Sequence, residues 1–251
     1  MKIKIDIKYL KFITLGFVLF TIIGTISHEL GHIIVAKSLG YETALYYGSM
    51  NYYPKGYLDD KDVIAFKNLT KDYVNIKYKS WPKEVKEKVE EYNNILQKRY
   101  WNEKSNNGLL VTIGGPLQTT LTGTFGLFIL IWRRKYIYKN GLKSLDWLAI
   151  FLSLFWLREI FNLVTSIGGE LISPNGNWFG GDELYISKSL NLWSGTISLI
   201  LATIGTVIAI YVIFRIIPKK IRQTFILSGF IGGIVGFILW MNIIGPKILP
   251  Y

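Results

Sequence analysis

Five apolar stretches constrain the fold of this chain more than any other feature. They cover approximately residues 12–36, 108–132, 145–167, 192–217 and 225–244. Each is long enough to cross the hydrocarbon core of a bilayer as an α-helix, which takes about 20 residues. A backbone surrounded by lipid must satisfy its own hydrogen bonds, so helices are expected for all five stretches. We therefore expect an all-α membrane protein with about five transmembrane helices.

A long polar insert separates the first two stretches and divides the chain into three parts. Residues 1–40 are expected to form the first transmembrane helix, residues 41–107 the insert, and residues 108–251 four further transmembrane helices. The first part of the insert, residues 41–57, is rich in tyrosine and is expected to be extended. The second part has a helix start at Ser80-Trp81-Pro82 and apolar residues recurring on one face. This amphipathic helix lies on the membrane or caps the site, or else it is a solvated helix that packs on its own insert.

The net charge of +12 falls mostly in short loops between the apolar stretches. Basic loops of this kind set the orientation of a membrane protein, so we interpret the charge as a topology signal and expect no nucleic-acid partner. The basic N-terminus and the basic loops after the second and fourth stretches predict that the N-terminus lies inside. No small-residue cleavage site follows the first stretch, which favours a retained helix over a signal peptide. We expect an integral, multi-pass protein of the plasma membrane.

The first apolar stretch contains the sequence His28-Glu29-Leu30-Gly31-His32, and its two histidines are the only ones in the chain. On a helix, residues at i and i+4 lie on one face, so both imidazoles can bind the same Zn²⁺ ion. Glu29 beside them is placed to take a proton from a zinc-activated water. Ionisable side chains are costly inside a membrane and point to function. The alternative, two histidines bonded to neighbouring helices, would not require Glu29.

A third zinc ligand must supply oxygen, because the chain has no cysteine and no further histidine. The candidates are Asp182, Glu159, Glu170 and Glu183. Asp182 follows two glycines and precedes the fourth apolar stretch, so it can begin a helix and turn inward. With five spans, it lies on the same membrane face as the histidines. The other role for Asp182 is to cap the helix that follows. We expect His28, His32 and Asp182 to hold one Zn²⁺ per chain.

The second apolar stretch opens with Gly114-Gly115-Pro116-Leu117-Gln118. Proline lacks an N–H group and disturbs the preceding turn, so this sequence predicts a helix irregularity that frees backbone carbonyls. In a bilayer, such an irregularity is tolerated where it is buried in protein or lines a wet cavity. Gly115, Pro116 and Gln118 are therefore candidate substrate contacts. The alternative is a packing kink at which the two glycines permit close helix contact.

These residues together resemble the site-2 protease family of membrane metalloproteases. The resemblance covers the helices up to about Asp182 and rests on the His28–His32 motif, on Gly114-Gly115-Pro116 and on Asp182 near a later helix start. It implies that the two histidines and an aspartate hold zinc and that Glu29 is the catalytic base. This chain has Asp182-Glu183 where the family has Asp-Gly. The family usually places its site near the cytoplasmic face, whereas the basic loops here predict that the zinc end faces outward.

The expected function is that of a membrane zinc metalloprotease that cleaves membrane or membrane-proximal protein substrates in or near the bilayer. A substrate helix must unwind before its carbonyls can be attacked, so a nearby strand edge would hold the unwound segment in extended form. Residues 41–57 are the expected source of that edge. The alternative is a non-proteolytic membrane protein that retains the zinc site for binding or assembly.

Overall fold

The computed structural model describes residues 5–100 and 107–249, and its fold is nearly all-α, with one short β-hairpin. Four helical segments are long and apolar enough to cross a membrane: Ile7–Ser38, Ser144–Ile172, Thr196–Ile216 and Lys219–Ile248. This is the composition of a multi-pass membrane protein. The elements are α1 (Ile7–Ser38), β1 (Glu42–Leu45), β2 (Met50–Tyr53), α2 (Lys61–Thr70), α3 (Lys83–Tyr100), α4 (Asn107–Asn140), α5 (Ser144–Ser153), α6 (Leu157–Ile172), α7 (Gly181–Ser189), α8 (Thr196–Tyr211), α9 (Arg222–Ile238) and α10 (Gly245–Ile248).

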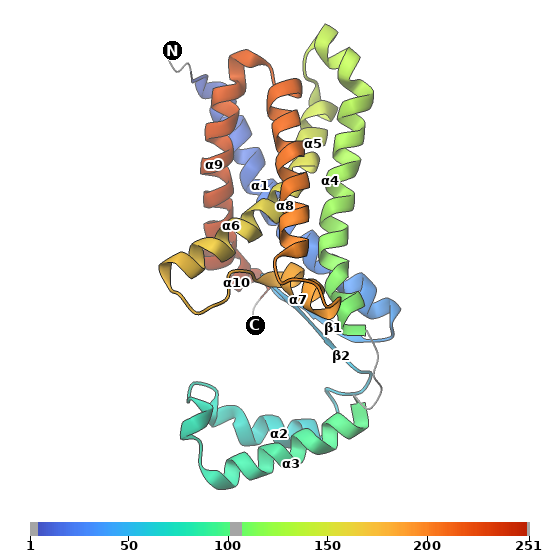
Figure 1. Ribbon diagram of the computed structural model, residues 1–251, viewed down its shortest axis with the longest axis vertical. Coiled ribbons are helices and arrows are strands. Elements are labelled where there is room, and N and C mark those ends of the chain that lie inside the picture. The colour runs from blue at the N-terminus through green and yellow to red at the C-terminus, as the bar shows by residue number, and fades with distance from the viewer. Residues whose placement is uncertain (1–4, 101–106, 250–251) are drawn as a thin grey trace.

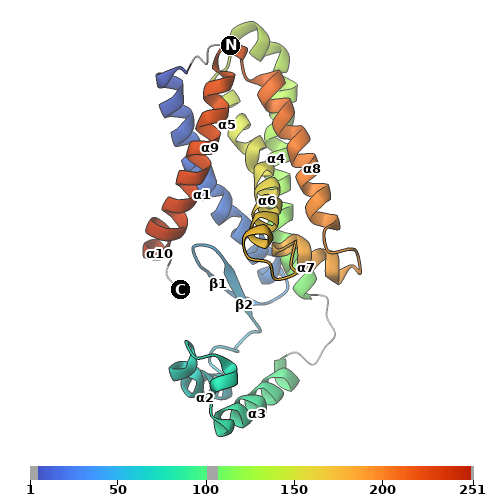
Figure 2. The same cartoon turned by 60° about the vertical axis from the view of Figure 1, so that its left-hand side comes forward.

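Helix α1 runs through the bundle and packs against α9 on one side and α4 on the other (Figures 1 and 2). Helix α4 also packs against α5, and α6 packs against α8. Glycines make the α1–α9 contact close: a Cβ at Gly232 would lie 2.6 Å from the carbonyl oxygen of Thr14, and one at Gly236 would lie 2.9 Å from the Cα of Val18. Small residues let membrane helices approach in this way.

The contact between α1 and α4 is closer still. A Cβ on Gly31 would lie 2.4 Å from the carbonyl oxygen of Gly114, and a Cβ on Gly114 would lie 2.6 Å from the carbonyl oxygen of Gly31. The two backbones therefore touch at this crossing, where neither position has room for a side chain. Because Gly31 lies between His28 and His32, the crossing presses the histidine face of α1 against α4.

Helix α4 differs from expectation at Pro116, where an irregular turn was predicted. The helix continues without a break from Asn107 to Asn140 with Pro116 inside it. The proline still withholds an N–H from the carbonyl of Thr112. Helix α4 is also not among the four candidate spans, although its 34 residues are ample for a membrane crossing. Gln118 and a run of threonines make its first half more polar than those spans. The prediction of about five spans stays a prediction.

The two strands form an antiparallel hairpin directly after α1, within the segment expected to be extended. Glu42 pairs with Tyr53 and Leu45 with Met50. The N–H of Tyr46 donates to the carbonyl of Ser49 at 2.9 Å, so these two residues form a hydrogen-bonded pair. From there along the strands, non-hydrogen-bonded and hydrogen-bonded pairs alternate. Met50 and Tyr52 therefore fall in non-hydrogen-bonded pairs, and their backbone N–H and C=O groups point away from β1. Among the described residues, no further strand pairs with this outer edge of β2.

Helices α2 and α3 form a separate hairpin beyond the strands, at the far end of the molecule (Figure 1). Val63 of α2 and Val89 and Leu96 of α3 are buried, and the rings of Phe66 and Tyr92 meet edge to face at 6.5 Å. The amphipathic helix α3 packs against α2 within the insert, and its position at a membrane stays a prediction.

The basic loops gather at one end of the bundle. The start of α1, the α4–α5 turn and the α8–α9 turn lie at the top in Figure 1, and the strands and α7 lie at the opposite end of the bundle. The α4–α5 turn is held by Asp146, which accepts from Arg133 Nε at 2.6 Å and from the N–H of Lys143 at 2.8 Å. The charge asymmetry expected from the sequence is therefore an asymmetry between the two ends of the fold.

We predict that the α2–α3 hairpin loosens as the pH falls from about 5 to about 2. Hydrogen bonds from Arg99, and then from Tyr100, lower the pKa of Asp60 to about 2. A lowered pKa stabilises the folded form above the unfolded pKa of about 3.9, and this contribution is lost as the pH falls through the folded value. Amide hydrogen exchange of α3, corrected for intrinsic rates, measures the effect.

The Asp60→Asn variant should lose protection of α3 already at neutral pH, whereas Asp59→Asn at the exposed neighbouring position serves as the matched control. Equal protection of α3 in the wild type at the two ends of this pH range would contradict the prediction.

Candidate metal centre

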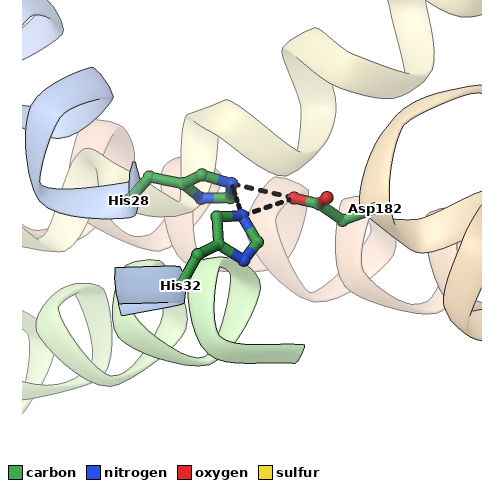
Figure 3. A group of neighbouring side chains, drawn as sticks. All are labelled: His28, His32 and Asp182. Carbon is green, nitrogen blue, oxygen red and sulfur yellow. Dashed lines mark hydrogen bonds and ion pairs between the residues drawn. The ribbon is translucent and has the colours of Figure 1, made fainter. Parts of the chain in front are cut away.

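Three side chains from two distant parts of the chain converge at one point. His28 and His32 come from α1 and Asp182 comes from α7, and Figure 3 shows their nitrogen and oxygen atoms facing one another. Asp182 Oδ2 lies 2.9 Å from His28 Nε2 and 3.2 Å from His32 Nε2, and the two Nε2 atoms are 3.2 Å apart. Tetrahedral zinc ligands are spaced about 3.3 Å apart for bond lengths of about 2.0 Å. The triangle is therefore close to the face of a metal-ligand tetrahedron.

Helix α4 orients both imidazoles through their other ring nitrogens. His32 Nδ1 lies 2.7 Å from the carbonyl oxygen of Val111, and His28 Nδ1 lies 2.9 Å from Thr119 Oγ1. A carbonyl only accepts, so His32 donates from Nδ1 to Val111, and in the neutral ring Nε2 then presents its lone pair to Asp182. Two acceptor atoms facing each other at this distance are stabilised by a cation between them. Such second hydrogen bonds typically fix the orientation of metal-binding histidines.

The turn before α7 directs Asp182 toward the histidines. Gly180 is the N-cap of α7, and Gly181 has a φ of 70°, a backbone conformation that favours glycine. Burial opposes ionisation of the Asp182 carboxyl, yet the neighbouring imidazoles of His28 and His32 hold its pKa below its usual range. Asp182 was expected at a helix start, and it lies at one, although the helix is the short α7 and not the apolar helix α8.

Gly115 provides the space in which the ligand atoms meet. A Cβ on this residue would lie 2.3 Å from His32 Nε2 and 2.5 Å from His28 Nε2. Only a glycine leaves both nitrogens free here. The residues present therefore fit a metal ion: two oriented imidazoles, one carboxylate, and a glycine where a side chain would fill the centre. Their role as ligands stays a prediction.

The other three candidates for the third ligand do not join the cluster. Glu170 accepts backbone N–H groups from Asn175, Gly176 and Asn177 and thereby closes the loop after α6. Glu183 is 1% exposed and accepts from Asn162 Nδ2 at 3.0 Å. Glu159 is also 1% exposed. Among the described residues, the group with metal-ligand geometry is His28, His32 and Asp182.

Glu29 and the three candidate ligands line a polar cavity of about 460 Å³. Glu29 is 6% exposed, and its Oε1 lies 4.0 Å from Nη2 of Arg158 at the start of α6. Thr112, whose carbonyl lacks a donor from Pro116, also lines this cavity, as do Met50 and Tyr52 of β2. The cavity therefore brings together a carboxylate, a guanidinium, the candidate metal ligands and two residues of strand β2.

The three candidate substrate contacts on α4 have different surroundings. Gly115 faces the histidines, Pro116 is buried, and Gln118 Nε2 donates to Thr122 at 2.9 Å. None of the three lines the polar cavity. Their role in substrate binding stays a prediction.

Sequence reasoning missed Val111, Thr119 and Arg158 as parts of the site. Thr119 lies one helical turn beyond Gly115 on α4, and this i, i+4 spacing is the signal that could have identified it. The role of Val111 is carried by its backbone, which no side-chain pattern reveals. Arg158 of α6 faces Glu29 of α1, with 4.0 Å between Nη2 and Oε1.

Comparison with known proteins gives no relative: the chain has no match to a family model and no significant match to a curated protein or a solved structure. The interpretation of this site therefore rests on its own residues and geometry.

We predict that Gly115→Ala weakens binding of a divalent metal by about tenfold or more, a typical cost of disturbing the surroundings of metal ligands. The added methyl group would collide with both Nε2 atoms while every candidate ligand remains in the chain. Titration with Co²⁺, followed by its absorption, measures the affinity.

Gly168→Ala on α6 is the matched control, because a Cβ there meets nothing within 4 Å. If Gly115→Ala bound Co²⁺ as tightly as the wild type, the metal would not lie between these nitrogens.

Proposed function

We propose that this protein is a membrane-embedded zinc metalloprotease that hydrolyses peptide bonds in or near the bilayer. One observation carries the proposal: His28, His32 and Asp182 converge within a bundle of apolar helices, and Glu29 lines the same cavity. A protein that only stores or binds a metal has no need of a carboxylate between its two histidines. Ionisable groups inside a membrane protein are costly and are kept for function.

The ligand set favours zinc and catalysis over a structural role. Two imidazoles and one carboxylate are three protein ligands, and catalytic zinc sites typically have three, whereas structural sites have four. When bound, zinc polarises a peptide carbonyl and lowers the pKa of water toward neutrality. His28, His32 and Asp182 would hold the ion, one per chain, and Val111 and Thr119 keep the two imidazoles in place.

Glu29 is the proton carrier in this proposal. Its carboxylate takes a proton from the attacking water and passes it to the amine that leaves when the peptide bond breaks. Arg158, 4.0 Å from Glu29, favours the ionised carboxylate that a base requires.

The outer edge of β2 is suited to hold the substrate. Met50 and Tyr52 line the polar cavity, and their backbone groups point away from β1. An extended peptide that added to this edge would lie beside the candidate metal ligands, with affinity from its backbone. Residues 41–57 were expected to provide such an edge. The register of the two strands and the lining of the polar cavity favour β2 over β1 as the substrate-binding strand.

The resemblance to site-2 proteases supports the same reaction, with His28, Glu29, His32 and Asp182 in matching roles. We further propose that α4 is a fifth membrane span, since Leu117, Leu121, Phe125 and Phe128 are each between 48% and 66% exposed on its outer surface. The basic end of the bundle would lie in the cytoplasm, so the site would open toward the outer face of the plasma membrane.

Glu29→Gln removes the base and leaves every candidate ligand, so zinc should remain near one per chain while peptide hydrolysis falls by at least about 10²-fold. His28→Ala should lose both zinc and activity, because no other imidazole can replace it. Metal analysis and hydrolysis of a reconstituted substrate peptide are measured on the same samples. Near-wild-type turnover by Glu29→Gln would exclude this residue as the proton carrier.

Met50→Pro should lower cleavage at least several-fold while zinc content stays normal, because proline removes a backbone donor from the outer edge of β2. Met50→Ala is the matched control, since it loses the same side chain and retains the N–H. The ratio of kcat/KM for the two variants is the measurement. Equal values would contradict strand addition at β2.

A further inference from the structure

A second, apolar cavity of about 450 Å³ lies between α1, the α5–α6 segment and α9. Phe17 and Phe20 of α1, Phe155 between α5 and α6, and Phe237 of α9 contribute to its walls. Phe230 of α9 also lines it and is 68% exposed, so the cavity reaches the lipid-facing surface of the bundle. Its size and its largely aromatic walls are those of a ligand pocket.

The apolar cavity adjoins the polar cavity that contains the candidate metal ligands. Gly48, Arg158 and Asn162 line both of them. Thr119, whose hydroxyl is bonded to His28, also lines the apolar cavity. A ligand could therefore place an apolar group between α1 and α9 and a polar group at the candidate metal centre.

Arg158 indicates which ligand suits this junction. Its Nε is buried and has no hydrogen-bond partner among the described residues, and its Nη2 is 4.0 Å from Glu29. A buried donor without a partner is costly, so a ligand that offers an acceptor here gains affinity. A peptide has a backbone carbonyl within one residue of an apolar side chain, whereas the middle of a lipid tail has no acceptor.

We propose that the apolar cavity is the specificity pocket of the protease and takes a bulky apolar side chain next to the bond that is cut. This inference rests on the proposed function and adds the class of substrate: peptides with phenylalanine or leucine beside the scissile bond. Two glycines leave room for that side chain. A Cβ on Gly233 meets nothing within 4 Å, and a Cβ on Gly24 lies 3.8 Å from the nearest atom of Phe155.

The test fills the pocket with Gly233→Leu and, separately, Gly24→Leu. Gly168→Leu is the matched control, because Gly168 also has open space and lines neither cavity. The probes are synthetic Leu/Ala transmembrane peptides with a central Gly-Gly-X segment, X being Ala, Val, Leu or Phe, in detergent micelles. The cut site is mapped by mass spectrometry, and kcat/KM is measured for each X.

Wild type and Gly168→Leu should cleave the Phe peptide about tenfold or more faster than the Ala peptide, which is the range that apolar pockets provide. Both filled variants should bring this ratio close to one while zinc content is unchanged. Binding of the same peptides is also measured for Glu29→Gln and for Glu29→Gln combined with Gly233→Leu. Loss of the preference for Phe in the double variant would show, without any catalysis, that the apolar cavity binds the side chain X.

Cleavage without a preference for X would contradict the assignment of the apolar cavity as the specificity pocket, and so would a preference that survives in both filled variants. Either result would be consistent with the proteolytic function. A lipid that co-purifies with the wild type and is lost from the filled variants, with peptide selectivity unchanged, would overturn it as well. If the zinc-loaded protein cleaved none of the peptides, the proposed function would be contradicted. The binding preference of Glu29→Gln and of the double variant would then test separately whether the apolar cavity binds the side chain X.

Discussion

The direct backbone contact between Gly31 of α1 and Gly114 of α4 is the constraint on which the candidate site depends. Neither position has space for a side chain, so the two helices lie as close as their backbones allow. At that distance the carbonyl of Val111 reaches His32 and the hydroxyl of Thr119 reaches His28. The i, i+4 spacing places both imidazoles on one face, and the crossing with α4 fixes which nitrogens face inward. A wider crossing would leave the motif on α1 with unoriented rings.

The rest of the bundle places costly polar groups around this crossing. Glu29, Arg158, Asn162 and Asp182 come from the three helices α1, α6 and α7 and line one cavity. The opposite end of the bundle has its own ion pair, between half-buried Arg133 and buried Asp146. Buried charges are tolerated where partners compensate them. At the α4–α5 turn the pairing is close and complete, which suits a structural role. Around Glu29 the ion pair is long, and Nε of Arg158 has no hydrogen-bond partner within the described part of the chain, which suits a site that exchanges water and substrate.

Much of this arrangement could be predicted from local sequence. The pairing of His28 with His32 depends only on helical periodicity, and the helical segments follow from apolar runs. Asp182 could be predicted from two glycines before a helix and from the topology of the spans. The features that local sequence did not predict depend on contacts between distant parts of the chain. Helix α4 continues through Pro116 because its packing against α1 holds the turn, a tertiary contact that outweighs the local preference. Val111 and Arg158 join the site through helix crossings that no periodicity encodes. The outer edge of β2 follows from strand register, which depends on the turn at Tyr46–Ser49.

The central claim is that His28, His32 and Asp182 bind one zinc ion through two nitrogens and one oxygen. X-ray absorption at the zinc edge on the purified membrane protein tests it most directly, because imidazole rings give a characteristic multiple-scattering pattern. We expect two imidazoles with Zn–N distances of about 2.0–2.1 Å, oxygen ligands in the remaining shell and no sulfur. The Asp182→Ala variant should retain the two-imidazole signal at reduced zinc occupancy. A spectrum with one imidazole or none, or with six oxygen ligands, would contradict the assignment of this cluster as the metal centre.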